Sequence, residues 1–355
     1  MTKVSERGLK MAEIGIIGAG SWGTALSVLL YKNGNHVTMW SIMEEEVEML
    51  KKEHEQKDKL PGVKLPEDMI FTTDLEQAVK GKDVLVLAVP SPYTRSTAAA
   101  IAPFAAKDQK IVNVAKGIEE TTLMTLSQII EEEIPDAEVA VLSGPSHAEE
   151  VGRGIPTTIV VGAENRETAE YIQNLFMNDV FRVYISSDVL GIELGAALKN
   201  VVALAAGIAD GLGYGDNTKA ALITRGIAEI ARLGISMGGR IETFYGLTGI
   251  GDLIVTCASM HSRNRRAGIL IGKGATMEEA MKEVKMVVEG VYSAKAGYAL
   301  SKEYNVSMPI VEQVNKVLFE GASADAAVKE LMLRDKKVEN IDLRNLYQNS
   351  VEVPW

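Results

Sequence analysis

The chain has 355 residues, a length that favours two domains, each with its own apolar core. Apolar residues make up 46% and charged residues 24%, which is the balance of a folded globular protein. The formal net charge of −11 disfavours nucleic acid as a partner, because such binding depends on clustered positive charge.

The longest apolar runs are short. Val201 to Ala209 is bounded by polar residues on both sides, whereas a bilayer requires roughly 20 apolar residues. Met1 to Lys10 are polar and lack the apolar stretch of a secretory signal, so they are left out of the predicted fold. The single cysteine, Cys257, fits a reducing compartment. We therefore expect a cytoplasmic protein without a membrane span and without a bound metal.

Short apolar runs alternate with amphipathic segments in the first half of the chain. This alternation is typical of a parallel sheet with helices on both faces. A helix is predicted over residues 24–33, and strands are predicted at residues 13–17, 36–40, 84–89, 110–115, 139–142 and 157–161. Six such strands predict an α/β Rossmann-like, doubly wound sheet.

From about residue 187 the segments become long, apolar at helical spacing and rich in alanine and glycine. The run from Val189 to about Ala209 is apolar nearly all round, which predicts a buried helix capped by Ser186 or Ser187. We therefore expect an all-α helical domain after the sheet, with domains at residues 11–190 and 191–345.

A glycine-rich loop follows the first predicted strand and opens the first predicted helix. Gly18-Ala19-Gly20-Ser21-Trp22-Gly23 fits the pattern G-x-G-x-x-G of dinucleotide-binding loops. Gly18 permits the tight turn, Gly20 lets the backbone approach a pyrophosphate, and Gly23 lets the helix pack close to the sheet. A glycine turn that merely packs is the alternative. We predict that NAD or NADP contacts Gly18, Gly20, Ser21, Trp22 and Gly23.

The end of the second strand does not discriminate between NAD and NADP. An acidic residue there favours NAD and a basic one favours NADP, but the strand ends in Trp40-Ser41-Ile42-Met43-Glu44. Glu44 lies about 20 residues after the loop, at the spacing of a ribose-binding acid. Its first-turn position favours a solvated helix residue instead.

Two lysines lie where chemistry is expected. Lys116 follows an apolar strand at the carboxyl edge of the sheet, where its ammonium can meet a phosphate; the alternative is a surface lysine before a turn. Lys199 lies midway along the most apolar helix, so burial and a nearby cation such as Lys116 would lower its pKa towards neutrality. A general acid/base needs such a pKa, although a lysine reaching solvent from the helix edge is the alternative.

Two further stretches carry candidate donors. Gly144-Pro145-Ser146 follows a strand and offers backbone and hydroxyl donors to an oxyanion, although it is also an ordinary turn; the next residue, His147, is interpreted as structural. The segment 262–266 places three arginines beside Ser262 and Asn264, which suits a phosphate unless the run is only solvated. Asp252 ends a glycine-rich turn and is a candidate helix cap.

These stretches, taken in order from the glycine loop to Val287-Val288-Glu289-Gly290, resemble the bacterial NAD(P)-dependent glycerol-3-phosphate dehydrogenase family. The resemblance implies that Lys199 exchanges the proton of the reacting carbonyl, as in other two-domain hydroxyacid dehydrogenases. It implies cofactor contacts at Lys116, Ala148, Arg263, Val287 and Glu289. It implies substrate contacts at Lys116, Gly144, Ser146, Lys199, Asp252, Ser262, Arg263 and Asn264.

The implied activity is reduction of dihydroxyacetone phosphate to glycerol 3-phosphate with NADH or NADPH, for phospholipid synthesis, by a homodimer. The chain departs from the family at Ile42 and Met43, where members that prefer NADPH usually carry a basic residue. Two alternatives stay open: a related two-domain hydroxyacid dehydrogenase that acts on a carboxylate, and a nucleotide sensor without catalysis.

Overall fold

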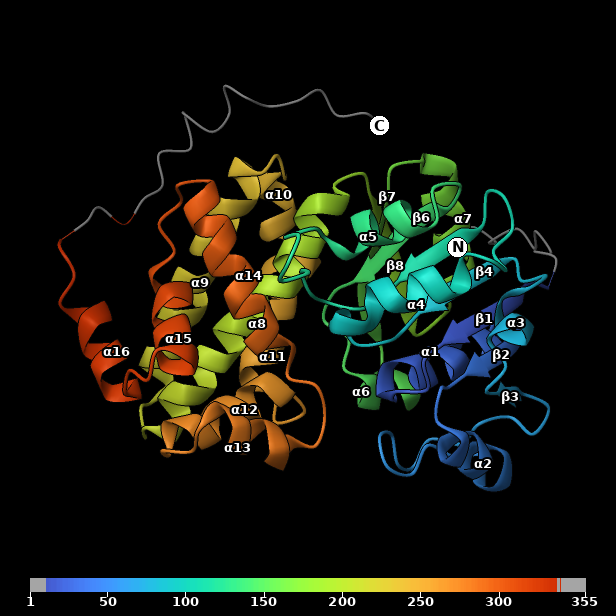
Figure 1. Ribbon diagram of the computed structural model, residues 1–355, viewed down its shortest axis with the longest axis horizontal. Coiled ribbons are helices and arrows are strands. Elements are labelled where there is room, and N and C mark those ends of the chain that lie inside the picture. Colours follow the sequence, from blue (N-terminus) through green and yellow to red (C-terminus); the bar gives the residue numbers. More distant parts are fainter. Residues whose placement is uncertain (1–10, 337–338, 340–355) are drawn as a thin grey trace, which may run out of the picture.

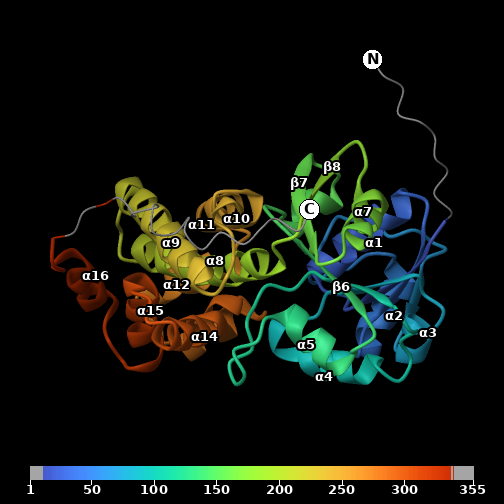
Figure 2. The ribbon, with the colours of Figure 1, turned by 90° about the horizontal axis from the view of Figure 1, so that it is seen from above.

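The computed structural model describes residues 11–336 and residue 339, and it consists of a sheet lobe and a helical lobe side by side (Figure 1). The expectations for Met1 to Lys10, and for a second domain ending at residue 345, lie outside these residues. Figure 2 shows the long helix α8 leading from the sheet into the helical lobe. The order of the two lobes confirms the predicted fold class.

One sheet organises the first lobe. Its strands run in the order β3-β2-β1-β4-β5-β6-β7-β8. Their bounds are β1 (Glu13–Ile17), β2 (His36–Trp40), β3 (Ile70–Thr72), β4 (Val84–Leu87), β5 (Lys110–Asn113), β6 (Glu138–Ser143), β7 (Thr157–Ala163) and β8 (Phe181–Ser186). The six predicted strands are confirmed, β1 and β2 with the predicted bounds and the other four with shifted ends. β3 and β8 were not predicted, and β3, with three residues, is too short to show a strand period.

The expectation of a wholly parallel sheet is wrong at one edge. β1 to β6 pair in parallel, but β7 runs antiparallel to β6, and β8 is parallel to β7. Parallel neighbours need a long crossover, usually a full helix. The helix between β6 and β7, α6 (Ala148–Gly152), has only five residues, too few to carry the chain back across the sheet.

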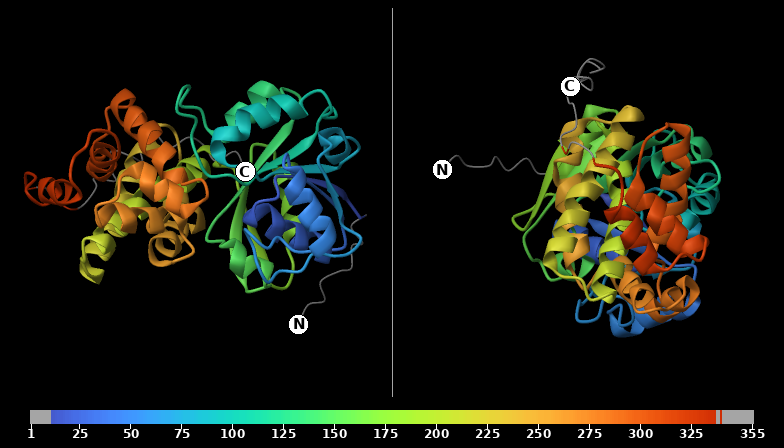
Figure 3. Two further views of the ribbon diagram at one scale, coloured as in Figure 1. Left: turned by 60° about the horizontal axis from the view of Figure 1, so that its bottom comes forward. Right: turned by 90° about the vertical axis from the view of Figure 1, so that its left-hand side faces the viewer.

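Helices cover both faces of the sheet, as the left view of Figure 3 shows. Ile14 and Ile16 of β1 join an apolar cluster on one face, whereas Ile17 joins the cluster on the other, as the two-residue period of a strand requires. The other helices of this lobe are α1 (Ser21–Lys32), α2 (Glu44–Glu53), α3 (Leu75–Val79), η1 (Ser91–Tyr93), α4 (Thr94–Ile101), α5 (Leu126–Glu133) and α7 (Arg166–Phe176).

The spine of the helical lobe is α8 (Val189–Gly211). Its cap is Asp188, whose carboxylate accepts a hydrogen bond from the Gly191 amide at 3.0 Å, so the predicted serine cap is wrong. By length and hydropathy α8 could cross a membrane, but 83% of the relevant window is buried in the protein. Because most of this helix is buried in the protein, it is a core helix. Its length and hydropathy alone would not distinguish a core helix from a membrane span.

The remaining helical elements surround α8. They are α9 (Asp216–Ser236), α10 (Ile241–Phe244), η2 (Leu247–Gly251), α11 (Asp252–Ala258), α12 (Arg263–Gly272), α13 (Met277–Val284), α14 (Glu289–Glu303), α15 (Pro309–Phe319) and α16 (Ala324–Met332). Helix α12 packs with its backbone directly against α8: a Cβ on Gly207 would lie 2.1 Å from the Arg265 carbonyl oxygen, and one on Gly268 would lie 2.2 Å from that of Leu204. This close approach brings the start of α12 against the C-terminal third of α8.

Candidate active site

A cavity of about 730 Å³ lies between the two lobes. Its walls come from the segments after β1, β2, β4, β5 and β6 on one side and from α8, α11, α12 and α14 on the other. The carboxyl edge of a parallel sheet is where ligands of such folds bind. Most predicted site residues line the cavity; Gly23, Gly144 and Asp252 do not, but each contacts a residue that does.

The glycine loop fits a pyrophosphate. Gly18 has φ +119°, and a Cβ there would lie 2.8 Å from the Ala88 carbonyl oxygen, so the turn requires glycine. A Cβ on Gly23 would lie 2.1 Å from the Gly18 carbonyl oxygen, whereas Gly20 has open space around it. Gly20 also precedes α1 without any capping side chain, so first-turn amides of that helix are available to an anion.

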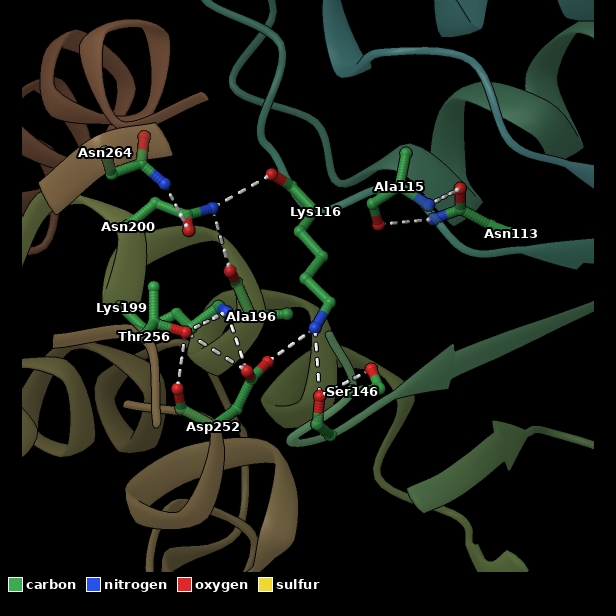
Figure 4. Close-up of polar contacts among 11 residues, drawn as sticks. Asn113, Ala115, Lys116, Ser146, Ala196, Lys199, Asn200, Asp252, Thr256 and Asn264 are labelled. Atoms are coloured by element: carbon green, nitrogen blue, oxygen red, sulfur yellow. Dashed lines mark hydrogen bonds and ion pairs between the residues drawn. The ribbon is translucent and has the colours of Figure 1, made fainter. Parts of the chain in front are cut away.

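A carboxylate joins two lysines at the reaction end of the cavity (Figure 4). Asp252, at the start of α11, accepts from Lys199 Nζ through Oδ1 at 2.7 Å and from Lys116 Nζ through Oδ2 at 2.6 Å. Lys199 is only 5% exposed although it lines the cavity, so the prediction that it is buried is confirmed. Three residues far apart in the chain thus form one cluster with a formal charge of +1.

Burial sets the ionisation of this cluster. It lowers the pKa of Lys199 to about 8; the charge of Asp252 opposes the shift, and the charge of Lys116 adds to it. For Asp252, burial opposes ionisation, but the charges of Lys116 and Lys199 outweigh it and lower the pKa. Lys199 can therefore both hold and release a proton near neutral pH, which is what a general acid/base requires.

Sequence reasoning missed Thr256 as a partner of Lys199. Lys199 Nζ donates to Thr256 Oγ1 at 2.6 Å, and this hydroxyl donates to the Asp252 carbonyl oxygen at 2.6 Å. Thr256 lies four residues after Asp252 on α11, so the two share one face of the helix. The four-residue spacing from Asp252 is the signal in the sequence that indicates Thr256.

A chain of amides joins the lobes, and its centre, Asn200, was not predicted as a site residue. Asn200 Nδ2 donates to the Lys116 carbonyl oxygen at 3.4 Å, and Asn200 Oδ1 accepts from Asn264 Nδ2 at 2.8 Å. Asn264 Oδ1 in turn accepts from the Gly290 amide at 2.8 Å. These bonds hold the segment after β5 against the starts of α12 and α14.

The predicted site of three arginines contains two. Arg263 and Arg266 line the cavity, and within residues 11–336 neither makes an ion pair or a hydrogen bond through its guanidinium; the Nε of Arg266 is buried without a partner. Arg265 faces away, because its Nε and Nη2 each lie 2.8 Å from Asp210 Oδ2. Ser262 lines the cavity and also caps α12, accepting from the Arg265 amide at 3.2 Å.

The Gly144–Ser146 turn also offers an acceptor, which the sequence did not predict. The Gly144 carbonyl oxygen accepts from Lys116 Nζ at 3.0 Å and from Ser146 Oγ at 2.9 Å, so the turn holds the lysine in place. His147 lines the cavity with its ring 5.7 Å from that of His261. Burial, followed by the charge of Lys199, lowers the pKa of His147, which disfavours it as a proton donor near pH 7.

The remaining predicted cofactor residues, Ala148, Val287 and Glu289, all line the cavity. The Glu289 carboxylate accepts from the Ser91 amide at 3.0 Å and from the Ser91 hydroxyl, so it ties α14 to the sheet lobe. Burial raises the pKa of Glu289, and the hydrogen bonds from Ser91 oppose that shift. Glu44 is exposed and does not line the cavity, in agreement with its interpretation as a solvated helix residue.

A dinucleotide loop and a buried, titratable lysine therefore face the same space between two lobes. That combination defines a class of protein, the two-domain dehydrogenases that use a nicotinamide dinucleotide. Comparison with known proteins narrows the class. The model of the NAD-dependent glycerol-3-phosphate dehydrogenase N-terminus matches residues 13–169, and the model of the C-terminus of the same enzyme matches residues 188–329. The chain belongs to this family, as the motifs predicted.

Individual relatives agree over nearly the full length. The chain is 68% identical over 333 residues to a glycerol-3-phosphate dehydrogenase (NAD(P)+) from Agathobacter rectalis, covering 94% of this chain and 99% of that protein. It is 51% identical over 345 residues to the protein of the same name from Bacillus subtilis, covering 96% and 100%.

Solved structures give the same result. The crystal structure of glycerol-3-phosphate dehydrogenase from Coxiella burnetii matches with a TM-score of 0.88 and 35% identity, covering 91% of this chain and 99% of that one. A ketopantoate reductase from Ralstonia eutropha matches with a TM-score of 0.58 at 15% identity, covering 90% and 99%. The second likeness shows the fold alone.

Proposed function

We propose that this chain catalyses the reversible reduction of dihydroxyacetone phosphate to sn-glycerol 3-phosphate with NADH or NADPH, and so supplies glycerol 3-phosphate for phospholipid synthesis. The observation that carries the proposal is that one cavity is lined both by the buried Lys199 ammonium and by the guanidinium of Arg263, which has no partner among the described residues. Such a pair suits a small ketone with a phosphate at its far end.

In this mechanism Lys199 is the general acid. Its ammonium protonates the oxygen of the ketone as that oxygen becomes an alkoxide, and Asp252 and Thr256 hold the ammonium in place through bonds of 2.7 and 2.6 Å. A nicotinamide dinucleotide bound at the glycine loop would supply the hydride. In the reverse direction the neutral amine of Lys199 takes the proton of the alcohol. A pKa of about 8 makes both forms accessible near neutral pH.

Lys116 and Arg263 position the substrate and stabilise charge. The second ammonium lies on the other oxygen of Asp252, so it adds positive potential where the alkoxide forms. Arg263, with Asn264 and Ser262 beside it, would hold the phosphate and thereby fix the approach of the carbonyl. Contacts of Gly144 and Ser146 with substrate, and of Ala148, Val287 and Glu289 with cofactor, belong to the same proposal.

We also propose a domain division, a cellular location and an oligomeric state. A division into residues 11–190 and 191–345 follows the change from strands to helices between Ser186 and Val189. A cytoplasmic location rests on the single, buried Cys257. A homodimer follows from analogy with the family, and sedimentation of the full chain tests it.

The deciding assay follows oxidation of NADH and of NADPH side by side with dihydroxyacetone phosphate. We expect turnover that depends on the phosphorylated ketone. A panel of 3-hydroxy acids, tested in the oxidative direction, is the comparison. Oxidation of such an acid without oxidation of glycerol 3-phosphate would favour the carboxylate-specific alternative, and dinucleotide binding without any turnover would favour a sensor.

A further inference from the structure

The cavity extends to the end of β2, where the ribose next to adenine is recognised in folds of this type. The residues that line it there are Trp40, Ser41, Ile42, Met43, Glu46 and Lys59. An acid at the strand end accepts from a ribose 2′-hydroxyl, whereas a basic residue holds a 2′-phosphate. This chain has Ser41 at that point, and the acid and the base follow later, on α2 and on the loop after it.

Glu46 is a buried carboxylate, 8% exposed, in the first turn of α2. Its Oε2 accepts from Ser41 Oγ at 2.5 Å, and its Oε1 accepts from Gln56 Nε2 at 2.6 Å and from Lys59 Nζ. Gln56 is fully buried and also donates to the Ala19 carbonyl oxygen of the glycine loop at 2.8 Å. The carboxylate is thus committed to three donors of the protein and is poorly placed to serve as the ribose acceptor of an NAD-specific site.

Lys59 provides the opposite charge. Its side chain is 31% exposed and lines the cavity, and an ammonium has three hydrogens to donate, so its bond to Glu46 leaves donors for a further anion. A 2′-phosphate beside Lys59 would be attracted by the ammonium and repelled by the carboxylate paired with it. The formally neutral pair therefore holds a 2′-phosphate more weakly than an unpaired lysine would.

We propose that Glu46 sets the balance between NADPH and NADH by neutralising Lys59, the residue that receives the 2′-phosphate. Glu46 is a positioning residue here, because it acts through Lys59. The inference rests on the proposed function only in that a nicotinamide dinucleotide binds. Because the test measures binding without substrate, it can fail while the proposed function stands, and the reverse also holds.

The main measurement is the Kd of NADPH and of NADH for the full chain, titrated separately in the absence of ketone. Glu46→Gln removes one negative charge and keeps the size of the side chain. Its amide oxygen can still accept from Gln56 and Lys59, and the Ser41 hydroxyl can turn to accept from its NH2. We expect NADPH to bind about tenfold more tightly and NADH to change less than about threefold, because only NADPH carries the 2′-phosphate. Added salt should reduce the gain.

Lys59→Met should weaken NADPH about tenfold and leave NADH within about threefold, whereas Lys59→Arg should restore NADPH binding. The double variant Glu46→Gln with Lys59→Met should have the NADPH to NADH ratio of Lys59→Met alone. Lys57→Met is the matched control, because Lys57 lies on the same loop, pairs with Glu53 at 2.7 Å and does not line the cavity.

An unchanged ratio in Glu46→Gln would overturn the proposal, and so would an equal gain in the presence and absence of Lys59. Melting curves check that each variant folds. If Glu46→Gln does not fold, the competition of adenosine 2′,5′-bisphosphate and adenosine 5′-monophosphate against NADPH, measured on the wild type and Lys59→Met, decides instead. If the two nucleotides compete with the same relative affinity in the wild type and in Lys59→Met, the proposal is also overturned.

Discussion

Two buried carboxylates, one in each lobe, hold lysines that line the same cavity, but the numbers of cations bound to them differ. Asp252, in the helical lobe, lies between two ammonium groups, so its cluster has a formal charge of +1. Glu46, in the sheet lobe, has one ammonium and two neutral donors, so its cluster is formally neutral. The comparison teaches that the number of cations around a buried acid sets the net charge of the site. Two cations, as at Asp252, leave a positive charge that attracts an anion strongly. One cation, as at Glu46, leaves a neutral site that can bind both a charged and an uncharged group.

The largest effect is expected at Lys199, which belongs to the cluster with a net positive charge. Lys199→Met should lower kcat for reduction of dihydroxyacetone phosphate by about two to three powers of ten, because the proton donor at the alkoxide is lost. Steady-state kinetics measure this, with a melting curve as the folding check. Lys219→Met, which removes a lysine outside the cavity, is the control and should retain wild-type kinetics. Near wild-type turnover in Lys199→Met would remove this lysine from the chemistry.

Asp252→Asn removes the negative charge from the cluster and leaves the two ammonium groups without a counter-charge. We expect kcat to fall about a hundredfold, because two ammonium groups lose the charge that holds them together. The charge of Asp252 raises the pKa of Lys199, so its removal should also move the pH at which reduction declines to a lower value. The pH profile of kcat tests this; a fall in kcat at an unchanged profile would mean that Asp252 acts by shape alone.

Arg263→Ala should raise KM for dihydroxyacetone phosphate about tenfold or more, with a smaller change in kcat, because a charged hydrogen bond to the phosphate is lost. Arg265→Ala is the matched control from the same helix turn, since Arg265 pairs with Asp210 and does not line the cavity. Equal increases in KM for both variants would contradict the assignment of the phosphate to Arg263.

The pH dependence of the wild type should have opposite signs in the two directions. Reduction needs the ammonium of Lys199, so kcat/KM for the ketone should fall as pH rises through about 8. Oxidation of glycerol 3-phosphate needs the neutral amine, so its kcat/KM should rise through the same pH. Profiles that decline together above pH 8 would point to a group other than Lys199.

The smallest effect is expected at Ser262, at the edge of the proposed phosphate site. Ser262→Ala removes the cap of α12 and should lower the free energy of unfolding by about 1 kcal/mol. KM should rise only a fewfold, because Arg263 and Asn264 remain. Denaturant unfolding and steady-state kinetics on the same preparation separate the two contributions. A large rise in KM without loss of stability would make Ser262 a main phosphate ligand.

The sequence by itself determined the class of fold, the glycine loop and the family. Local patterns carry these features: strand and helix periods appear in short windows, and the loop needs Gly18 and Gly23 because any Cβ there meets backbone. The apolar surroundings of Lys199 likewise predicted its burial, because a helix that is apolar all round must lie in a core.

Only the tertiary structure decided which charges meet. Arg263, Arg265 and Arg266 are alike in sequence, but the rotation of α12 against α8 turns Arg265 to Asp210 and leaves the other two at the cavity. The antiparallel β7, the Lys116–Asp252–Lys199 cluster and the Glu46–Lys59 pair likewise depend on contacts between distant segments. Coulombic interactions depend on distance in space, which sequence spacing does not provide.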